Sequence, residues 1–414
     1  YMYRKDFSKF DNKPIKRIMK TSTLLVLSLL TLNLLGQTEA PTIEAANELI
    51  ENKKYESAYT LLEKLDPENK KPEVAILKTE ILMDYFVTSM MHQMFALKDL
   101  EEDEDIEDYR GQNGSFSMHM FAVDSILSSL IKQHPNNCNL HKTLGDFYYD
   151  AYLKYGKNWI IPEQEIVSKI ESTYTKSTSL GCDDYMSNYA LGYIYLLEEK
   201  NKKSIPYFLK SIDLKDDYAS CHYNLAYAYL FMDKREKALI YAKNALERYE
   251  DRQYKSDAAR MVGQIYTELE NEKEAIIYYE KANQIDPNNY YNLKALLKVY
   301  VSNDHKLTNT ITLKLYNLAP ENPSIYDALD ECYSSSGKEK ELISFLQSQL
   351  LNAGNSKTVE GNLNFYLARM HVTSDKMKAK KYFLESKKAF EQIFEKDHSV
   401  FYIIEEGLKE CESK

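Results

Sequence analysis

Histidine and cysteine, the residues that most often do chemistry, are present in this sequence but are not grouped. The eight histidines are His92, His119, His134, His141, His222, His305, His371 and His398. No two of them have the spacing that would place a pair of metal ligands on one helix face. The chain also lacks a nucleophilic-serine motif, a phosphate-binding glycine loop and a nucleotide fingerprint. We therefore expect no catalytic residues, no metal site and no cofactor, and so a protein that is not an enzyme.

The five cysteines are scattered and contain no C-x-x-C pair, which argues against a zinc site. Cys138 opens the first helix of one predicted repeat, and Cys182 closes its second helix. Because antiparallel helices bring these ends together, an oxidising compartment would allow a disulfide, provided that the Cα atoms lie less than about 7 Å apart. The sequence leaves open whether the bond forms.

Three further features each have two interpretations. The acidic run Glu101–Asp108 is either a calcium loop or a solvated loop, and its lack of ligand spacing and of a turn glycine favours the second. Trp159 is either an exposed anchor or folds back onto its own helices, which we favour. A methionine cluster is either an adaptable binding surface or, as we favour, part of the core. Its members are Met83, Met90, Met91, Met94, Met118 and Met120.

A repeat with a period near 34 residues runs through the middle of the chain. From position 185, the pair Leu191-Gly192 is followed by Tyr195 and then Phe208. The same spacing recurs from positions 219, 256, 290 and 323. Each unit predicts two antiparallel helices, in which the small residue of the first helix lets the second helix approach closely.

This pattern resembles the tetratricopeptide repeat, W-x-x-L-G-x-x-Y then A-x-x-x-F and a closing proline. The resemblance implies an all-α fold, a right-handed superhelical solenoid of helix-turn-helix repeats. It extends over about 40–411, giving about nine helix pairs, and is specific only for 185–337.

The regularity of the repeat divides the chain into four segments. We expect a secretory signal region at 1–36, degenerate repeats with inserts at 37–184, well-matched repeats at 185–337, and degenerate repeats with a capping helix at 338–414. The inserts carry the acidic run and Trp159, and the capping helix is expected from His398 to Cys411.

The resemblance implies a concave groove lined by the fifth and ninth places of each first helix. In four successive repeats these places hold Tyr189, Tyr193, Tyr223, Tyr227, Arg260, Gln264, Lys294 and Lys298. We expect the tyrosines to form an aromatic floor and the cations a basic end where a ligand carboxylate docks. The alternative is that the tyrosines pack helix against helix.

Residues Thr21–Gly36 are largely apolar and follow Lys16, Arg17 and Lys20, which is typical of a secretory signal. The apolar stretch is too short for a comfortable membrane span, although a retained signal-anchor is the alternative. A start at Met19 would make residues 1–18 an over-extended reading frame. We expect cleavage near Gly36-Gln37 and an exported protein, periplasmic or secreted, with no stable membrane insertion after processing.

The formal net charge of the chain is −10, and residues 1–36 carry an excess of basic residues. The remaining acidic body repels phosphate, so nucleic acid is not an expected partner. The sequence favours a scaffold that binds a protein or extended peptide in its concave groove. The alternative is a glycan- or peptidoglycan-fragment-binding accessory to an envelope enzyme. The oligomeric state is not predicted.

Overall fold

The computed structural model describes residues 41–412, with the exception of 92, 113 and 115. It has two compact units, one ending at Ala228 and the other beginning at Tyr229. The expected signal region lies outside the described residues. Among the described helices, none combines the length and the apolar character needed to cross a bilayer.

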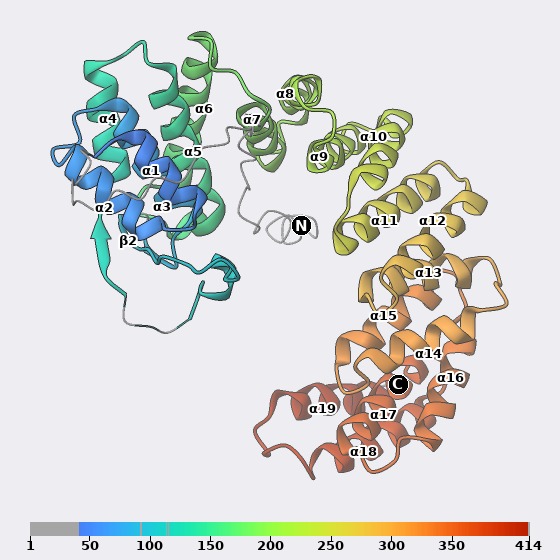
Figure 1. The fold of residues 1–414 in the computed structure, drawn as a ribbon. Coiled ribbons are helices and arrows are strands. Elements are labelled where there is room, and N and C mark those ends of the chain that lie inside the picture. The colour runs from blue at the N-terminus through green and yellow to red at the C-terminus, as the bar shows by residue number, and fades with distance from the viewer. Residues whose placement is uncertain (1–40, 92, 113, 115, 413–414) are drawn as a thin grey trace. The chain divides into compact units, whose positions relative to one another are not determined.

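The first unit contains four helix pairs (Figure 1). They are α1 (Ile43–Glu51) with α2 (Tyr55–Leu65), α3 (Pro72–Asp84) with α4 (Val123–Gln133), α5 (Cys138–Tyr155) with α6 (Glu163–Ser179), and α7 (Tyr185–Leu197) with α8 (Asn201–Leu214). Two short 3-10 helices, η2 (Ile106–Asp108) and η3 (Gly156–Asn158), lie in the inserts. Helix α9 (Ala219–Leu230) contains the boundary between the units.

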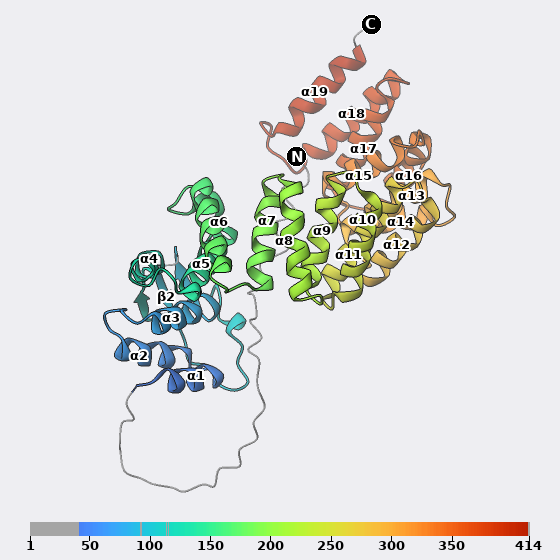
Figure 2. The same ribbon diagram turned by 90° about the horizontal axis from the view of Figure 1, so that it is seen from above.

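The second unit continues the same alternation and ends in an additional helix, α19 (Ser399–Glu412) (Figure 2). Its other helices are α10 (Arg235–Arg248), α11 (Arg252–Glu268), α12 (Glu272–Ile285), α13 (Tyr290–Ser302), α14 (Thr308–Leu318), α15 (Pro323–Ser334), α16 (Glu339–Leu351), α17 (Lys357–His371) and α18 (Lys376–Phe390). The 19 α-helices of the described residues equal nine pairs and a closing helix, which confirms the predicted number.

Polar caps fix where several of the first helices begin. The side chain of Asp184 accepts a hydrogen bond from the Ser187 amide at the start of α7, and Asn289 and Asn322 cap α13 and α15 in the same way. Such caps satisfy amides that have no partner within the helix. Helix α11 begins earlier than the repeat predicts, since Asp251 caps it and its extra residues join its first turn.

Glycine allows the two helices of a repeat to approach closely, as predicted. A Cβ atom on Gly192 of α7 would lie 2.7 Å from the ring of Phe208 on α8, which is too close for any substituent. Gly263 on α11 has the same relation to Tyr279 on α12, at 2.8 Å. The hydrogen atom of each glycine thus leaves room for a buried aromatic ring.

The predicted all-α repeat fold is confirmed, and the insert between α3 and α4 adds a small sheet to it. This insert contains an antiparallel sheet of order β1-β2-β3, formed by β1 (Thr88–Met90), β2 (Met94–Ala96) and β3 (Met118–Met120). Strands of three residues are too short to show an alternating pattern in the sequence.

Within the same insert the acidic run forms a loop. Glu104 forms an ion pair with Lys98 and accepts a hydrogen bond from Tyr109. No three His, Cys, Asp or Glu side chains of the described residues are grouped so as to hold a metal ion.

Trp159 folds back onto its own helices, as favoured from the sequence. The side chain is buried, and its ring packs edge-on against Phe147 and Tyr148 of α5. Its indole Nε1 donates a hydrogen bond to the carbonyl oxygen of Met91, at 3.3 Å. The tryptophan therefore joins the third helix pair to the sheet insert.

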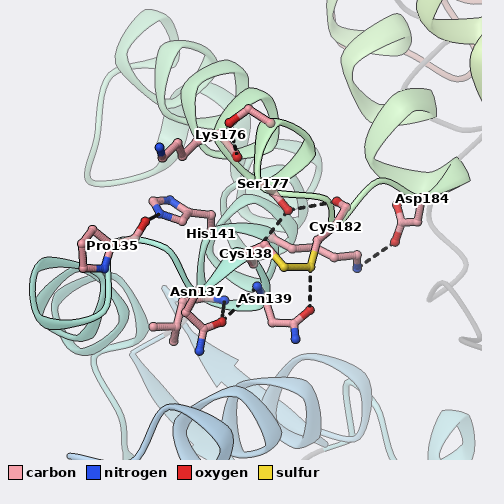
Figure 3. The surroundings of a disulfide bond; sticks show 12 residues. Pro135, Asn137, Cys138, Asn139, His141, Lys176, Ser177, Cys182 and Asp184 are labelled. Carbon is pink, nitrogen blue, oxygen red and sulfur yellow. Dashed lines mark hydrogen bonds and ion pairs between the residues drawn. A yellow bond between two sulfur atoms is a disulfide. The ribbon is translucent and has the colours of Figure 1, made fainter.

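Cys138 and Cys182 form a disulfide bond, with their Cα atoms 5.5 Å apart (Figure 3). The hydroxyl of Ser177 donates to the carbonyl oxygens of both cysteines, at 3.1 and 3.0 Å. The bond joins the beginning of α5 to the turn that follows α6, so the predicted meeting of the two helix ends is confirmed.

Candidate partner-binding face

The first-helix face is defined here as the surface formed by the second, fifth and ninth places of each first helix. In the first unit it carries Tyr189 and Tyr193 on α7 and Tyr223 and Tyr227 on α9. The rings of Tyr189 and Tyr193 stack with centroids 5.8 Å apart, and those of Tyr223 and Tyr227 meet edge-on at 5.1 Å. The predicted residues are therefore neighbours within each helix.

Burial separates these tyrosines into two kinds. Tyr189, Tyr193 and Tyr223 are no more than 2 % exposed, whereas Tyr227 is partly exposed. The hydroxyl of Tyr189 accepts a hydrogen bond from the amide of Asn224, at 2.9 Å, and its ring contacts Phe208. Tyr189, Tyr193 and Tyr223 are thus buried, as in the packing alternative, and the expectation that they form an aromatic floor for a ligand is wrong. The physical reason is that a ring at the fifth place reaches the next first helix.

In the second unit, Arg260 on α11 lies between an acid and an aromatic ring. Its Nη2 atom is 2.8 Å from Asp257 Oδ1, and its guanidinium carbon is 5.5 Å from the centroid of the Tyr291 ring. Tyr291, at the second place of α13, is exposed. Gln264, the next predicted residue, donates to Glu268 on its own helix at 3.2 Å. Arg260 is thus held beside an accessible aromatic surface.

Lys294 and Lys298 on α13 both face Glu331 on α15. The Nζ atoms lie 2.6 and 3.7 Å from its carboxylate oxygens. The hydrogen bond from Lys294 lowers the pKa of the Glu331 carboxyl, which remains ionised. Together with Arg260 and Asp257, the two lysines and Glu331 make three cations and two carboxylates, which leaves one net positive charge. The expected basic end is therefore largely neutralised, because the next repeat places an acid opposite the two lysines.

The face continues beyond the predicted residues onto α15 and α17. Asp327 accepts a hydrogen bond from the hydroxyl of Tyr366, at 2.7 Å, and lies 3.5 Å from Arg369. Asp327 and Glu331 occupy the fifth and ninth places of the repeat from 323, so extending the same rule by one repeat would have found them. Tyr291 was missed because only two of the places on the face were considered.

Three segments of the chain match the family model of the tetratricopeptide repeat, at residues 187–218, 219–252 and 261–289. These segments coincide with α7 to α12, the helices whose glycines and caps were described above. The middle of the chain therefore contains tetratricopeptide repeats.

No curated protein matches the chain. Among solved structures, a tetratricopeptide-repeat protein from Parabacteroides merdae is similar to it at 17 % identity, covering 66 % of this chain and 99 % of that one, with a TM-score of 0.40. The protein YrrB, described as having an unusual peptide-binding site, is 17 % identical over 42 % of this chain and 81 % of its own, with a TM-score of 0.35. PilF of Pseudomonas aeruginosa is 14 % identical over 60 % and 92 %, with a TM-score of 0.36.

Proposed function

We propose that this tetratricopeptide-repeat protein is an exported scaffold that binds an extended segment of a partner protein on its first-helix face. The observation that carries the proposal is the row of partly exposed ion pairs on α11, α13, α15 and α17, together with the exposed ring of Tyr291. Partly exposed ion pairs contribute only about 0–1 kcal/mol each. They can therefore be exchanged for a partner's charges at little cost in stability.

The chemistry of this face defines the partner segment. The exposed ammonium of Lys298 and the guanidinium of Arg260 would bind carboxylates of the partner. The exposed ring of Tyr291, itself a rigid side chain, offers an apolar contact. An extended segment with acidic and aromatic or apolar side chains fits this arrangement. Glycan binding, the alternative, needs a platform of open aromatic rings, and the burial of Tyr189, Tyr193 and Tyr223 does not favour it.

The combined change Lys298→Glu and Tyr291→Ala is expected to weaken partner binding by at least about tenfold, since it removes a charged contact and an aromatic anchor. The partner would be identified by capture on the intact protein from envelope fractions and mass spectrometry, and its affinity then measured. The control changes Lys314→Glu and Tyr402→Ala alter an exposed lysine on α14 and an exposed tyrosine on α19. Equal affinity of the two double variants would rule out the first-helix face.

The proposal that the protein is exported rests on two independent features. The basic and then apolar pattern before residue 37 is that of a cleaved signal, and a disulfide such as Cys138–Cys182 persists mainly in oxidising compartments. We expect the mature protein to begin near Gln37 and to be recovered from the periplasm or the medium. N-terminal sequencing checks this. Recovery of the chain from membranes with residues 21–36 intact would instead indicate a signal-anchor.

A further inference from the structure

The small sheet of the first unit brings methionine side chains together on one face. In its register, Met90 of β1 pairs with Met94 of β2, and Met94 pairs with Met120 of β3. Directly paired residues point to the same side of a sheet. The three methionines therefore form one row across all three strands, which is called here the methionine row. Met118 lies on the same face, two residues before Met120.

The opposite face of the sheet is directed toward the core. Its row consists of Ser89, Phe95 and His119, and Phe95 is completely buried. His119 packs against the ring of Tyr59, with centroids 5.0 Å apart. The methionine row lies on the other side of the sheet, where Ala96 of the central strand is also buried but the outer methionines reach solvent. Met90 and Met120 are 58 and 74 % exposed, which contradicts the core packing that the sequence favoured for them.

The spacing of the methionine row would allow its three side chains to contact one bound ion. Paired residues in an antiparallel sheet have Cβ atoms about 5 Å apart. A methionine sulfur lies two bonds beyond Cβ, so the sulfurs of Met90 and Met120 can lean inward over that of Met94. Unbranched methionine side chains have the rotational freedom to do this. Three thioethers can thus surround one point above the central strand.

Thioether sulfur is a soft, neutral ligand, and among biological metal ions it selects Cu(I), whereas hard cations require oxygen ligands. The row contains no carboxylate or imidazole that would favour a harder ion. We propose that Met90, Met94 and Met120 bind one Cu(I) ion through their thioether sulfurs, with Met118 as a neighbouring fourth donor. The site is independent of the first-helix face and of the partner that binds there.

The test is a metal titration of the full-length mature protein with its disulfide intact. Ag(I) serves as the first probe because it has the same ligand preference and needs no reductant. A Cys411→Ser background removes the one partly exposed free thiol of the described residues, since Cys221 and Cys332 are buried. We expect one equivalent of Ag(I) to bind. X-ray absorption of the Cu(I)-loaded protein is expected to show only sulfur neighbours around the metal.

Leucine substitutions separate metal binding from apolar docking, because leucine keeps the apolar volume and removes the sulfur. Met90→Leu, Met94→Leu and Met120→Leu are each expected to weaken binding, because each removes one of the three thioether ligands, and the triple variant is expected to abolish it. Met377→Leu, at an exposed methionine of α18, is the matched control and should bind as the background does. Circular dichroism verifies folding of each variant. The proposal is overturned if the background protein binds no stoichiometric metal, or if the triple variant binds it equally well.

Discussion

Replacing Phe208 by alanine is expected to lower the free energy of unfolding by about 3–5 kcal/mol. The ring is completely buried between α7 and α8, where it contacts Tyr189 and lies against Gly192. Its removal leaves a cavity that the two closely packed helices cannot fill. Denaturant unfolding followed by far-ultraviolet circular dichroism measures the change. Leu209→Ala, at the exposed neighbouring position, is the control and should cost far less.

A second substitution tests whether position 192 requires glycine because of the Phe208 ring. In the wild-type protein, Gly192→Ala places a methyl group 2.7 Å from the ring and is expected to destabilise by about 1–3 kcal/mol. In the Phe208→Ala background the space is empty, so the same change should stabilise by up to about 1 kcal/mol through helix propensity. The reversal of sign in this double-mutant cycle is the expected result. Equal effects in both backgrounds would show that the contact is unimportant.

Loss of the Cys138–Cys182 disulfide is expected to lower the stability of the first unit by about 4 kcal/mol, because its cysteines are 44 positions apart and the unfolded chain gains the entropy of that loop. The variant changes both cysteines to serine. Trp159 is the only tryptophan of the chain and is buried against α5, one of the two joined helices, so its fluorescence reports this region. Dithiothreitol should shift the unfolding midpoint of the wild type but not that of the variant, and Cys411→Ser should leave the midpoint unchanged. An unchanged midpoint in reduced wild-type protein would contradict the expectation.

Most of the helical architecture could be predicted because the repeat encodes it locally. Four of the five predicted repeat starts, at 185, 219, 290 and 323, are the first residues of helices α7, α9, α13 and α15. In the pair of α7 and α8, for example, the cap Asp184, the small residue Gly192 and its aromatic partner Phe208 are all close in sequence. The disulfide could be anticipated for the same reason, since it joins the two ends of one pair.

The remaining features depend on contacts that the period does not contain. The strands around Met94 are held by pairing between segments of one insert. A strand of three residues is too short to show a recognisable alternation of polar and apolar residues. The burial of Tyr189 depends on Asn224 in the following repeat, and the charge of Lys294 is offset by Glu331 from the next first helix. A position in the repeat therefore predicts which face a residue occupies, but not which neighbour covers or neutralises it.

The covalent link between the start of α5 and the turn after α6 also limits how far the chain can be stretched. The Cα atoms of two linked residues 44 positions apart stay within about 7 Å of each other however strongly the ends of the chain are pulled. Fully extended, that segment would span about 150 Å. An unfolding motor or protease that draws in the oxidised chain meets a closed loop at Cys138, and must accommodate two strands side by side or stop there. Reduction of the Cys138–Cys182 disulfide would allow the segment between the two cysteines to extend.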